Sequence, residues 1–221
     1  MELKYYIILG VISSLIVILR KKNLADSKNI EKRKAVREKS RKMLIRLNES
    51  RDVNHPISKY ILKLLENFHA HEKISKTLLE EEIKAIEGNL NLTLPKSYKI
   101  FLKYFGDGGN WVFAQSIDSI QKGRFFFEHD FHQQINEYIY LETEKIKTSS
   151  LLSLMVEDSN GGAWCWLTHN NEKENEWPLV YYLNNKLYYK VENFTEWMKI
   201  LVETEGEVIR FLDTEEKLGL G

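Results

Sequence analysis

Apolar residues form one unbroken run near the start of the sequence, and further along they recur with the period of helices and then of strands. The run covers residues 5–19 and contains no charged side chain. A helix of that length is roughly 22 Å long, which is short for a bilayer core of about 30 Å. Lys4 and Arg20 flank the run and can extend their charged ends towards the headgroups. We therefore expect a short transmembrane helix here.

The basic cluster at residues 20–22 sets the expected direction of this helix. A secretory signal peptide carries its positive charge before the apolar run and ends at a small-residue cleavage site, and neither feature is present. A buried core helix is the other alternative, but such a helix is rarely apolar on every side at a chain terminus. Because positive residues are retained on the cytoplasmic side, residues 1–22 are predicted to be a single-pass anchor in the cell membrane, with the C-terminal domain in the cytoplasm.

Residues 23–54 are polar, contain neither proline nor glycine, and favour a helix. Their positive charge predicts a basic helical stalk or linker that stays close to anionic lipid headgroups. Two alternatives to this lipid contact remain open: a basic arm that binds nucleic acid, and a stalk that is merely solvated.

From residue 55 onwards the apolar spacing becomes that of three amphipathic helices. One face of the first helix is formed by the apolar residues at 57, 60, 61, 64, 65 and 68. Thr77 and Glu80 have the spacing of a capping box and predict that a second helix begins at Thr77. A third helix begins at Pro95 and ends at residues 106–109, where glycine readily adopts the left-handed conformation that closes helices.

Beyond residue 110 the pattern changes to short runs rich in β-branched and aromatic residues, which is typical of strands. Such runs lie at residues 111–117, 124–129, 137–142, 151–157, 163–169, 178–183 and 186–191. Asn184 and Asn185 separate the last two runs as the turn of a tight hairpin. Asn193 then begins a closing helix, with Glu196 as its capping partner. Helices, an antiparallel meander and a final helix predict an α+β domain over residues 55–221.

Composition supports a packed domain and divides the chain by charge. Apolar residues make up 43% and aromatic residues 12% of the 221 residues, which suits a globular core and excludes disorder throughout. Residues 1–51 carry 14 Lys and Arg against 5 Asp and Glu, whereas the remainder carries 18 against 27. The N-terminal part is therefore +9 and the rest −9. The one cysteine, Cys165, excludes an internal disulfide and fits a reducing compartment.

Ordered landmarks between residues 77 and 203 resemble those of the SUKH superfamily. In the family, a helix opens with leucine and proline and continues to a tyrosine, a phenylalanine–leucine pair and glycines, which are here Leu94, Pro95, Tyr98, Phe101, Leu102, Gly108 and Gly109. The residues of this chain that resemble the later family landmarks are Gly161 and Gly162 of a hairpin, Pro178 of a strand and Phe194 of the closing helix. Ala163 departs from the family, which commonly has an aspartate there. The resemblance implies helices packed on an antiparallel SUKH-like sheet.

The same resemblance implies a function. The superfamily includes fungal cell-wall-synthesis regulators of the Smi/Knr type and many bacterial immunity proteins. Together with the predicted anchor, it implies a non-enzymatic, membrane-tethered binding protein that neutralises a cognate toxin by occluding it. The alternative is a membrane-held scaffold or regulator of cell-envelope synthesis, which rests on analogy of fold.

Aromatic and acidic residues in the second half of the domain predict the partner-binding surface. In a paired run such as Tyr181-Tyr182, strand alternation sends one ring to each face, and exposed aromatic residues are favoured in binding surfaces. Neighbouring carboxylates suit a basic toxin and repel the phosphates of nucleic acid. The candidate residues are Glu157, Asp158, Trp164, Trp166, Glu172, Glu174, Glu176 and Tyr182. No nucleic acid, small-molecule substrate or cofactor is expected.

Candidate catalytic chemistry is limited to one cluster of imidazoles and a carboxylate. His129, Asp130 and His132, with His169 as a further ligand, are residue types that bind zinc, and they keep a metal-dependent hydrolase as a remote alternative. The simpler interpretation places them in solvent at a strand edge and loop.

Cys165 lies between two tryptophans in a predicted strand, which favours a buried thiol over a nucleophile. Neither glycine run has the form of a phosphate-binding loop.

Overall fold

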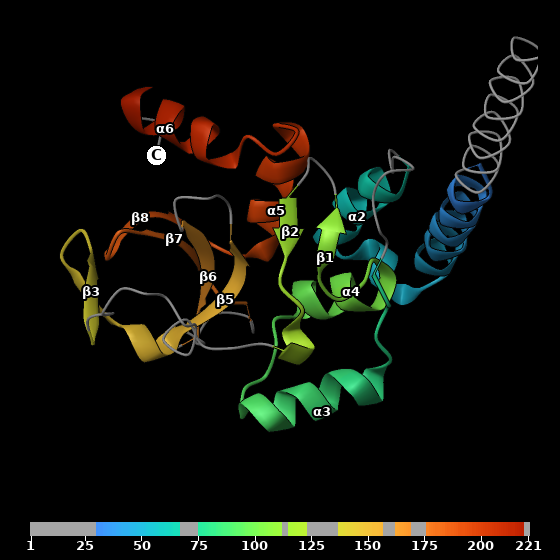
Figure 1. Cartoon of the computed structure of the whole chain (residues 1–221), viewed down its shortest axis with the longest axis horizontal. Helices are drawn as coiled ribbons and strands as arrows, with labels where there is room; N and C mark the ends of the chain where they lie inside the picture. The colour runs from blue at the N-terminus through green and yellow to red at the C-terminus, as the bar shows by residue number, and fades with distance from the viewer. Residues whose placement is uncertain are drawn as a thin grey trace, which may run out of the picture.

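The computed structural model shows a group of helices lying beside a four-stranded sheet (Figure 1). It describes residues 30–66, 75–111, 115–122, 137–156, 162–168 and 176–218. Within these residues, helices come first, antiparallel strands follow, and two helices end the order. This order agrees with the predicted α+β arrangement.

The helices form where the sequence places apolar residues on one side. They are a helix over residues 30–48, α2 (Pro56–Glu66), α3 (Glu80–Leu90), α4 (Lys96–Tyr104), α5 (Phe194–Glu203) and α6 (Val208–Leu218), with 3-10 turns η1 (Arg51–Asn54), η3 (Ile120–Lys122) and η5 (Thr148–Ser150). α2 buries the predicted face, since Ile57, Ile61 and Leu64 are at most 2% exposed. The period of 3.6 residues was therefore sufficient to identify its inner side.

The predicted starts of two helices have different outcomes. α5 begins as predicted, because Asn193 Oδ1 accepts a hydrogen bond from the backbone N–H of Glu196 (3.0 Å). α3 begins three residues after the predicted Thr77, and Glu82 accepts the capping hydrogen bond from the backbone N–H of Leu79 (2.8 Å). The capping rule expects serine or threonine at the N-cap and so pointed to Thr77 and Glu80, whereas the structure places Leu79 at the N-cap and Glu82 three residues later.

The described strands pair into three antiparallel sheets. They are β1 (Gly109–Trp111), β2 (Gln115–Ile117), β3 (Tyr138–Leu141), β4 (Glu144–Lys147), β5 (Leu151–Val156), β6 (Ala163–Leu167), β7 (Leu179–Leu183) and β8 (Lys186–Val191). β5 to β8 form one sheet in sequence order, β1 pairs with β2, and β3 pairs with β4. The single strand predicted over 111–117 is wrong, since β1 and β2 pair with each other. β4 lies where no strand was predicted, and the strand predicted over 124–129 lies outside the described residues.

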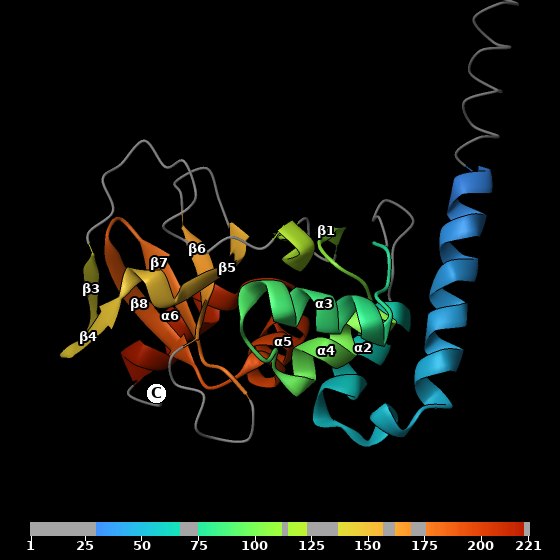
Figure 2. The same ribbon diagram turned by 90° about the horizontal axis from the view of Figure 1, so that it is seen from below.

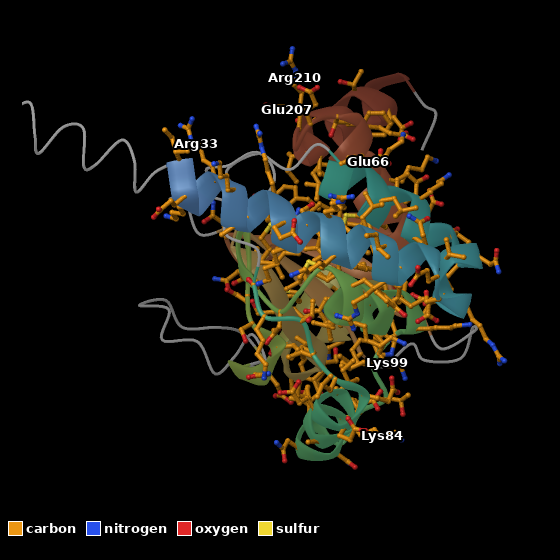
Figure 3. The ribbon with its side chains drawn as sticks, turned by 90° about the vertical axis from the view of Figure 1, so that its right-hand side faces the viewer. Arg33, Glu66, Lys84, Lys99, Glu207 and Arg210 are labelled. Atoms are coloured by element: carbon orange, nitrogen blue, oxygen red, sulfur yellow. The ribbon has the colours of Figure 1, made fainter. Side chains whose placement is uncertain are left out.

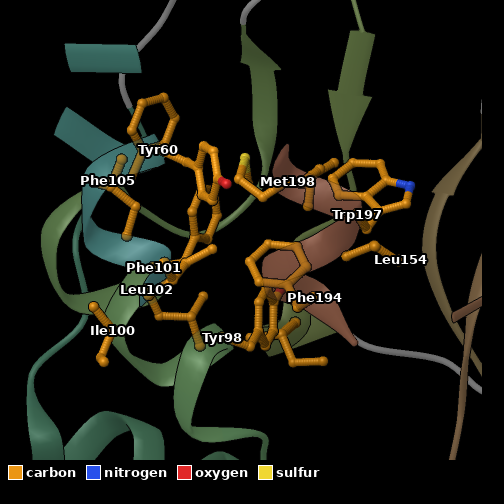
Figure 4. Packing of buried hydrophobic residues seen from close by; sticks show 14 of the residues in the cluster. Tyr60, Tyr98, Ile100, Phe101, Leu102, Phe105, Leu154, Phe194, Trp197 and Met198 are labelled. Carbon is orange, nitrogen blue, oxygen red and sulfur yellow. The ribbon is translucent and has the colours of Figure 1, made fainter. Parts of the chain in front are cut away.

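One face of the four-stranded sheet packs against the helices. Trp166 of β6 lies 5.2 Å from Tyr98 of α4 and 5.3 Å from Phe194 of α5, measured between ring centroids. Figure 4 shows Tyr98 and Phe194 within this aromatic cluster, beside Trp197 and Met198 of α5. The family landmarks in this region are at most 1% exposed, and they are Leu94, Tyr98, Phe101, Leu102 and Phe194. Their residue types are therefore explained by packing.

The opposite face of the sheet is covered by the β3–β4 hairpin. Cys165 of β6 and Val180 of β7 belong to a second apolar cluster with Ile139 of β3 and Ile146 of β4, and each of these four side chains is at most 1% exposed. Figures 1 and 2 both show the hairpin at the edge of the molecule next to β8, at the far end from helix 30–48. The central strands β6 and β7 are therefore buried on both sides, whereas Tyr188 of the edge strand β8 is 47% exposed.

Helix 30–48 packs on the domain core. Met43 is 4% exposed and Leu47 is fully buried, and both belong to the same cluster as the helix side of the sheet. Ser40 Oγ donates a hydrogen bond to the carbonyl oxygen of Leu65 in α2 (2.6 Å). Figure 3 views the domain from the side on which this helix lies. The packed unit thus includes residues on both sides of the boundary predicted at 54, while a stalk role for residues 23–54 stays a prediction.

Among the described residues, no helix has the length and apolar character that crossing a membrane requires. The fold class is corrected accordingly: the α+β arrangement stands, whereas a transmembrane helix and a single-pass location in the cell membrane are not supported. Helix 30–48 illustrates the physical reason, because it carries charged side chains along its length and ionised groups are costly in a bilayer. Residues 5–19, where the span was predicted, lie outside the described residues.

Two glycines of the family pattern occupy positions where a side chain does not fit. Gly108 has a φ of 70°, and an added Cβ would lie 2.6 Å from the backbone nitrogen of Ser119. At Gly162 an added Cβ would overlap the hydroxyl of Tyr181 and lie 2.7 Å from its Cζ. Gly162 therefore makes room for a tyrosine ring of the neighbouring strand β7, whereas Gly109 begins β1 and Gly161 lies outside the described residues.

Glu176 caps α4 from a distant part of the sequence. Its carboxylate accepts hydrogen bonds from the backbone N–H of Ser97 (2.8 Å) and from Ser97 Oγ. The N-cap residue itself, Pro95, makes no side-chain hydrogen bond to the helix. A negative charge at a helix N-terminus also interacts favourably with the helix dipole. This contact links the segment before β7 to the helix that carries Tyr98.

Removal of the distant cap is expected to weaken the fold. Glu176→Ala and Ser97→Ala should each lower the free energy of unfolding by about 1–2 kcal/mol, because a charge-assisted capping hydrogen bond is lost. The double variant should cost less than the sum of the two, since the hydrogen bond from Ser97 Oγ to Glu176 is lost in both single variants. Urea unfolding followed by tryptophan fluorescence measures all three. Strict additivity would show that the two residues act independently.

Gly162→Ala is expected to lower the free energy of unfolding by about 1–3 kcal/mol, because the added methyl displaces the Tyr181 ring. The extra cost should shrink in a Tyr181→Leu background, where the ring is absent. Gly88→Ala is the matched control, since a Cβ there meets no atom within 4 Å and alanine in a helix is about 0.5–1 kcal/mol better than glycine. An equal loss for Gly162→Ala in both backgrounds would contradict this explanation.

Candidate functional site

The two tryptophans predicted as binding anchors lie in the core. Trp164 and Trp166 of β6 are both 0% exposed. The ring centroid of Trp164 lies 5.4 Å from that of Tyr181, and the centroid of Trp166 lies 6.0 Å from that of Trp177. Both indoles point to the face of the sheet that packs on the helices. In this structure neither ring is available to a partner.

Tyr182 follows the predicted alternation but is also buried. It lies in the cluster under the β3–β4 hairpin, whereas Tyr181 lies in the cluster on the helix side. Tyr182 is 6% exposed, and its hydroxyl donates a hydrogen bond to Asn185 Oδ1 (2.7 Å) in the β7–β8 turn. Burial raises the pKa of this hydroxyl. Alternation therefore separated the two rings correctly, but the second face of the strand is not a surface.

The predicted carboxylates are only partly placed. Glu176 is half-buried and caps α4 through Ser97, as described above. The other predicted acidic residues lie outside the described residues, and they are Glu157, Asp158, Glu172 and Glu174. An acidic surface for a basic toxin thus stays a prediction.

Candidate catalytic groups are likewise placed only in part. The residues of the suggested zinc cluster lie outside the described residues, and they are His129, Asp130, His132 and His169. In the part of the chain that the structure describes, no three histidine, cysteine or acidic residues lie close enough to hold a metal ion. Cys165 is a buried free thiol, as predicted. Burial, and secondarily the charge of Asp118, raises the pKa of this thiol, which keeps it protonated at neutral pH.

An exposed pair of tyrosines lies on the β3–β4 hairpin. Tyr138 is 37% and Tyr140 is 56% exposed, whereas Ile139 between them is 1% exposed. The antiparallel register places Lys147 opposite Tyr138 and Lys145 opposite Tyr140. Residues directly opposite in such a pair share one face of the sheet, so both lysines accompany the tyrosines. We call Tyr138, Tyr140, Lys145 and Lys147 the hairpin face.

The sequence held a signal for this face that the prediction did not use. Residues 137–142 were recognised as a strand, and the alternation of Tyr138 and Tyr140 with Ile139 and Leu141 already separates the two sides. The partner strand β4 was missed, because its four residues include three charged ones. Without β4, neither lysine had a predicted place beside the rings.

Comparison with known proteins identifies the family. A family model described as SMI1-KNR4 cell-wall (SUKH_6) matches residues 80–198, just over half of the chain. No curated protein matches the chain. The matched segment runs from α3 to Met198 in α5 and includes the buried landmarks from Leu94 to Phe194. The resemblance inferred from those landmarks is confirmed, and this chain belongs to the SUKH superfamily, in its SMI1-KNR4 family.

Proposed function

We propose that this protein acts by binding another protein, and that it is an immunity protein that neutralises a cognate toxin by occluding it. The family supports a protein partner of this kind and a non-enzymatic role. We assign the binding to the hairpin face, because Tyr138 and Tyr140 are exposed there, at one end of the molecule.

Exposed tyrosines suit such a role for a physical reason. A tyrosine ring contributes a large apolar area and a hydroxyl while losing little rotamer entropy on binding, and tyrosine is enriched among residues that dominate interface energies. Tyr138 and Tyr140 project from a strand whose inner side chains are fixed in a buried cluster. Binding by such a surface needs no rearrangement of the core.

The partner is proposed to be a toxin protein. The charge of −9 over residues 52–221 favours a toxin that is basic overall, because long-range attraction speeds the encounter of oppositely charged proteins. The carboxylates predicted to contact it at 157, 158, 172 and 174 belong to this proposal. Neutralisation by occlusion requires only that the bound domain cover the surface that the toxin uses.

A scaffold or regulator of cell-envelope synthesis is the second candidate function. The family description names the cell wall, and that is the observation that favours it. A scaffold would bind one or more wall-synthesis enzymes, whereas an immunity protein binds a toxin. The two candidates therefore differ in what the full chain retains in a pull-down.

The immunity function is tested by co-expression of the full chain with candidate toxins, including any that is encoded beside its gene. Cells should survive a toxin dose that kills cells lacking this chain, and the toxin should co-purify with it. Tyr138→Ala together with Tyr140→Ala should reduce the tolerated dose about tenfold or more, as expected for loss of two interface aromatics. Ile45→Ala, which removes an exposed apolar side chain from helix 30–48, should leave protection unchanged. If no culture survives the toxin and the full chain retains only wall-synthesis enzymes in a pull-down, the immunity function is rejected.

A further inference from the structure

The β3–β4 hairpin separates its side chains by chemistry. Ile139 and Ile146 lie opposite each other and are buried, at 1% and 0% exposure. On the other side of the same two strands, Tyr138 pairs with Lys147 and Tyr140 with Lys145. The outward side is therefore a compact set of two rings and two ammonium groups, with no carboxylate among its four residues.

Buried apolar contacts, a hydrogen bond and an ion pair hold the hairpin in place on the domain. Its two isoleucines pack in the second apolar cluster, which includes Leu151, Cys165, Leu167, Val180 and Leu187. At its base, the backbone N–H of Thr148 donates a hydrogen bond to the carbonyl oxygen of Glu137 (3.0 Å). Glu144 at the tip forms an ion pair with Lys190 of β8 (3.4 Å). The outward side chains are thus presented by a positioned strand pair, and such preorganisation lowers the cost of binding.

The local charge of the hairpin face is positive. Lys145 Nζ lies 3.9 Å from the centroid of the Tyr138 ring, within the range of a cation–π interaction. Lys147 is exposed on the same side. The carboxylate of Glu144 is held by Lys190 on the opposite side, and Glu137 and Glu142 flank the two ends of β3. Between these ends the face offers ammonium and phenol donors, which call for acceptors that carry negative charge.

We propose that the hairpin face binds a carboxylate-rich segment of the partner protein, with Lys145 and Lys147 facing its carboxylates and the two tyrosines packing against its apolar side-chain stems. This inference rests on the proposed function and names the chemistry of its contact surface. It sets a local requirement opposite to the one set by the net charge of the domain: a toxin that is basic overall presents an acidic patch here. Nucleic acid also carries acceptors, but the charge of −9 over residues 52–221 opposes its approach.

The test uses the full chain, with two labelled peptides of equal length as probes, one glutamate-rich and one lysine-rich. The glutamate-rich peptide should shift the backbone amide resonances of β3 and β4, and the lysine-rich peptide should not. Lys145→Glu with Lys147→Glu should weaken the glutamate-rich peptide about tenfold or more, because attraction becomes repulsion. Arg37→Glu with Arg41→Glu, the same charge change on helix 30–48 at the far end of the molecule, should leave the β3 and β4 shifts unchanged.

Three results would overturn the inference: β3 and β4 shifts with the lysine-rich peptide, undiminished binding by the Lys145 and Lys147 variant, or tighter binding of a labelled single-stranded oligonucleotide at the hairpin. Its failure is distinguishable from that of the immunity function. If cells carrying the Lys145 and Lys147 variant still survive the toxin at the original dose, the immunity function stands and the hairpin assignment falls. If no toxin is neutralised but the glutamate-rich peptide binds the hairpin, the assignment stands and the immunity function falls.

Discussion

The structure depends on the packing of one sheet face against two helices. Trp164 and Trp166 of β6 meet an aromatic cluster built by Tyr98 of α4 and by Phe194 and Trp197 of α5. Each such ring buries roughly 150–250 Å², and full burial of one large apolar side chain contributes about 1.5–3 kcal/mol. Because α4 and α5 are far apart in the sequence and β6 lies between them, this cluster holds the start and the end of the family segment together.

This packing is accompanied by two further contacts between distant parts of the chain. A tyrosine on β7 reaches across to β6, so Gly162 has no room for a side chain. α4 must be positioned for Tyr98 to enter the cluster, and its N-terminus is capped by Glu176 from the segment before β7. A residue predicted to bind a partner therefore has a structural role. The charge of Glu176 stabilises the N-terminal end of α4.

Burial of the second sheet face decides where a partner can bind. The β3–β4 hairpin covers Cys165 and Val180, so the aromatic residues of the central strands are enclosed on both sides. The outward side of the hairpin then carries two exposed tyrosines with lysines beside them, and Tyr188 of β8 is exposed as well. The domain as a whole is acidic while this face is locally basic. Long-range steering and short-range contact thus depend on different groups of the same molecule.

The sequence by itself determined what depends on neighbours along the chain: the buried face of α2, the Asn193 cap of α5, the α+β order and the family landmarks. It did not determine which strand faces are covered, because alternation separates Tyr181 from Tyr182 without showing that Ile139 and Ile146 lie over the second face. For the same reason it did not place Trp164 or find the hairpin face. An apolar run at residues 5–19 predicted a membrane span, whereas no helix that the structure describes is long and apolar enough to cross a membrane. Only tertiary contacts between distant residues decide which side chains remain on the surface, since burial is a property of the assembled fold.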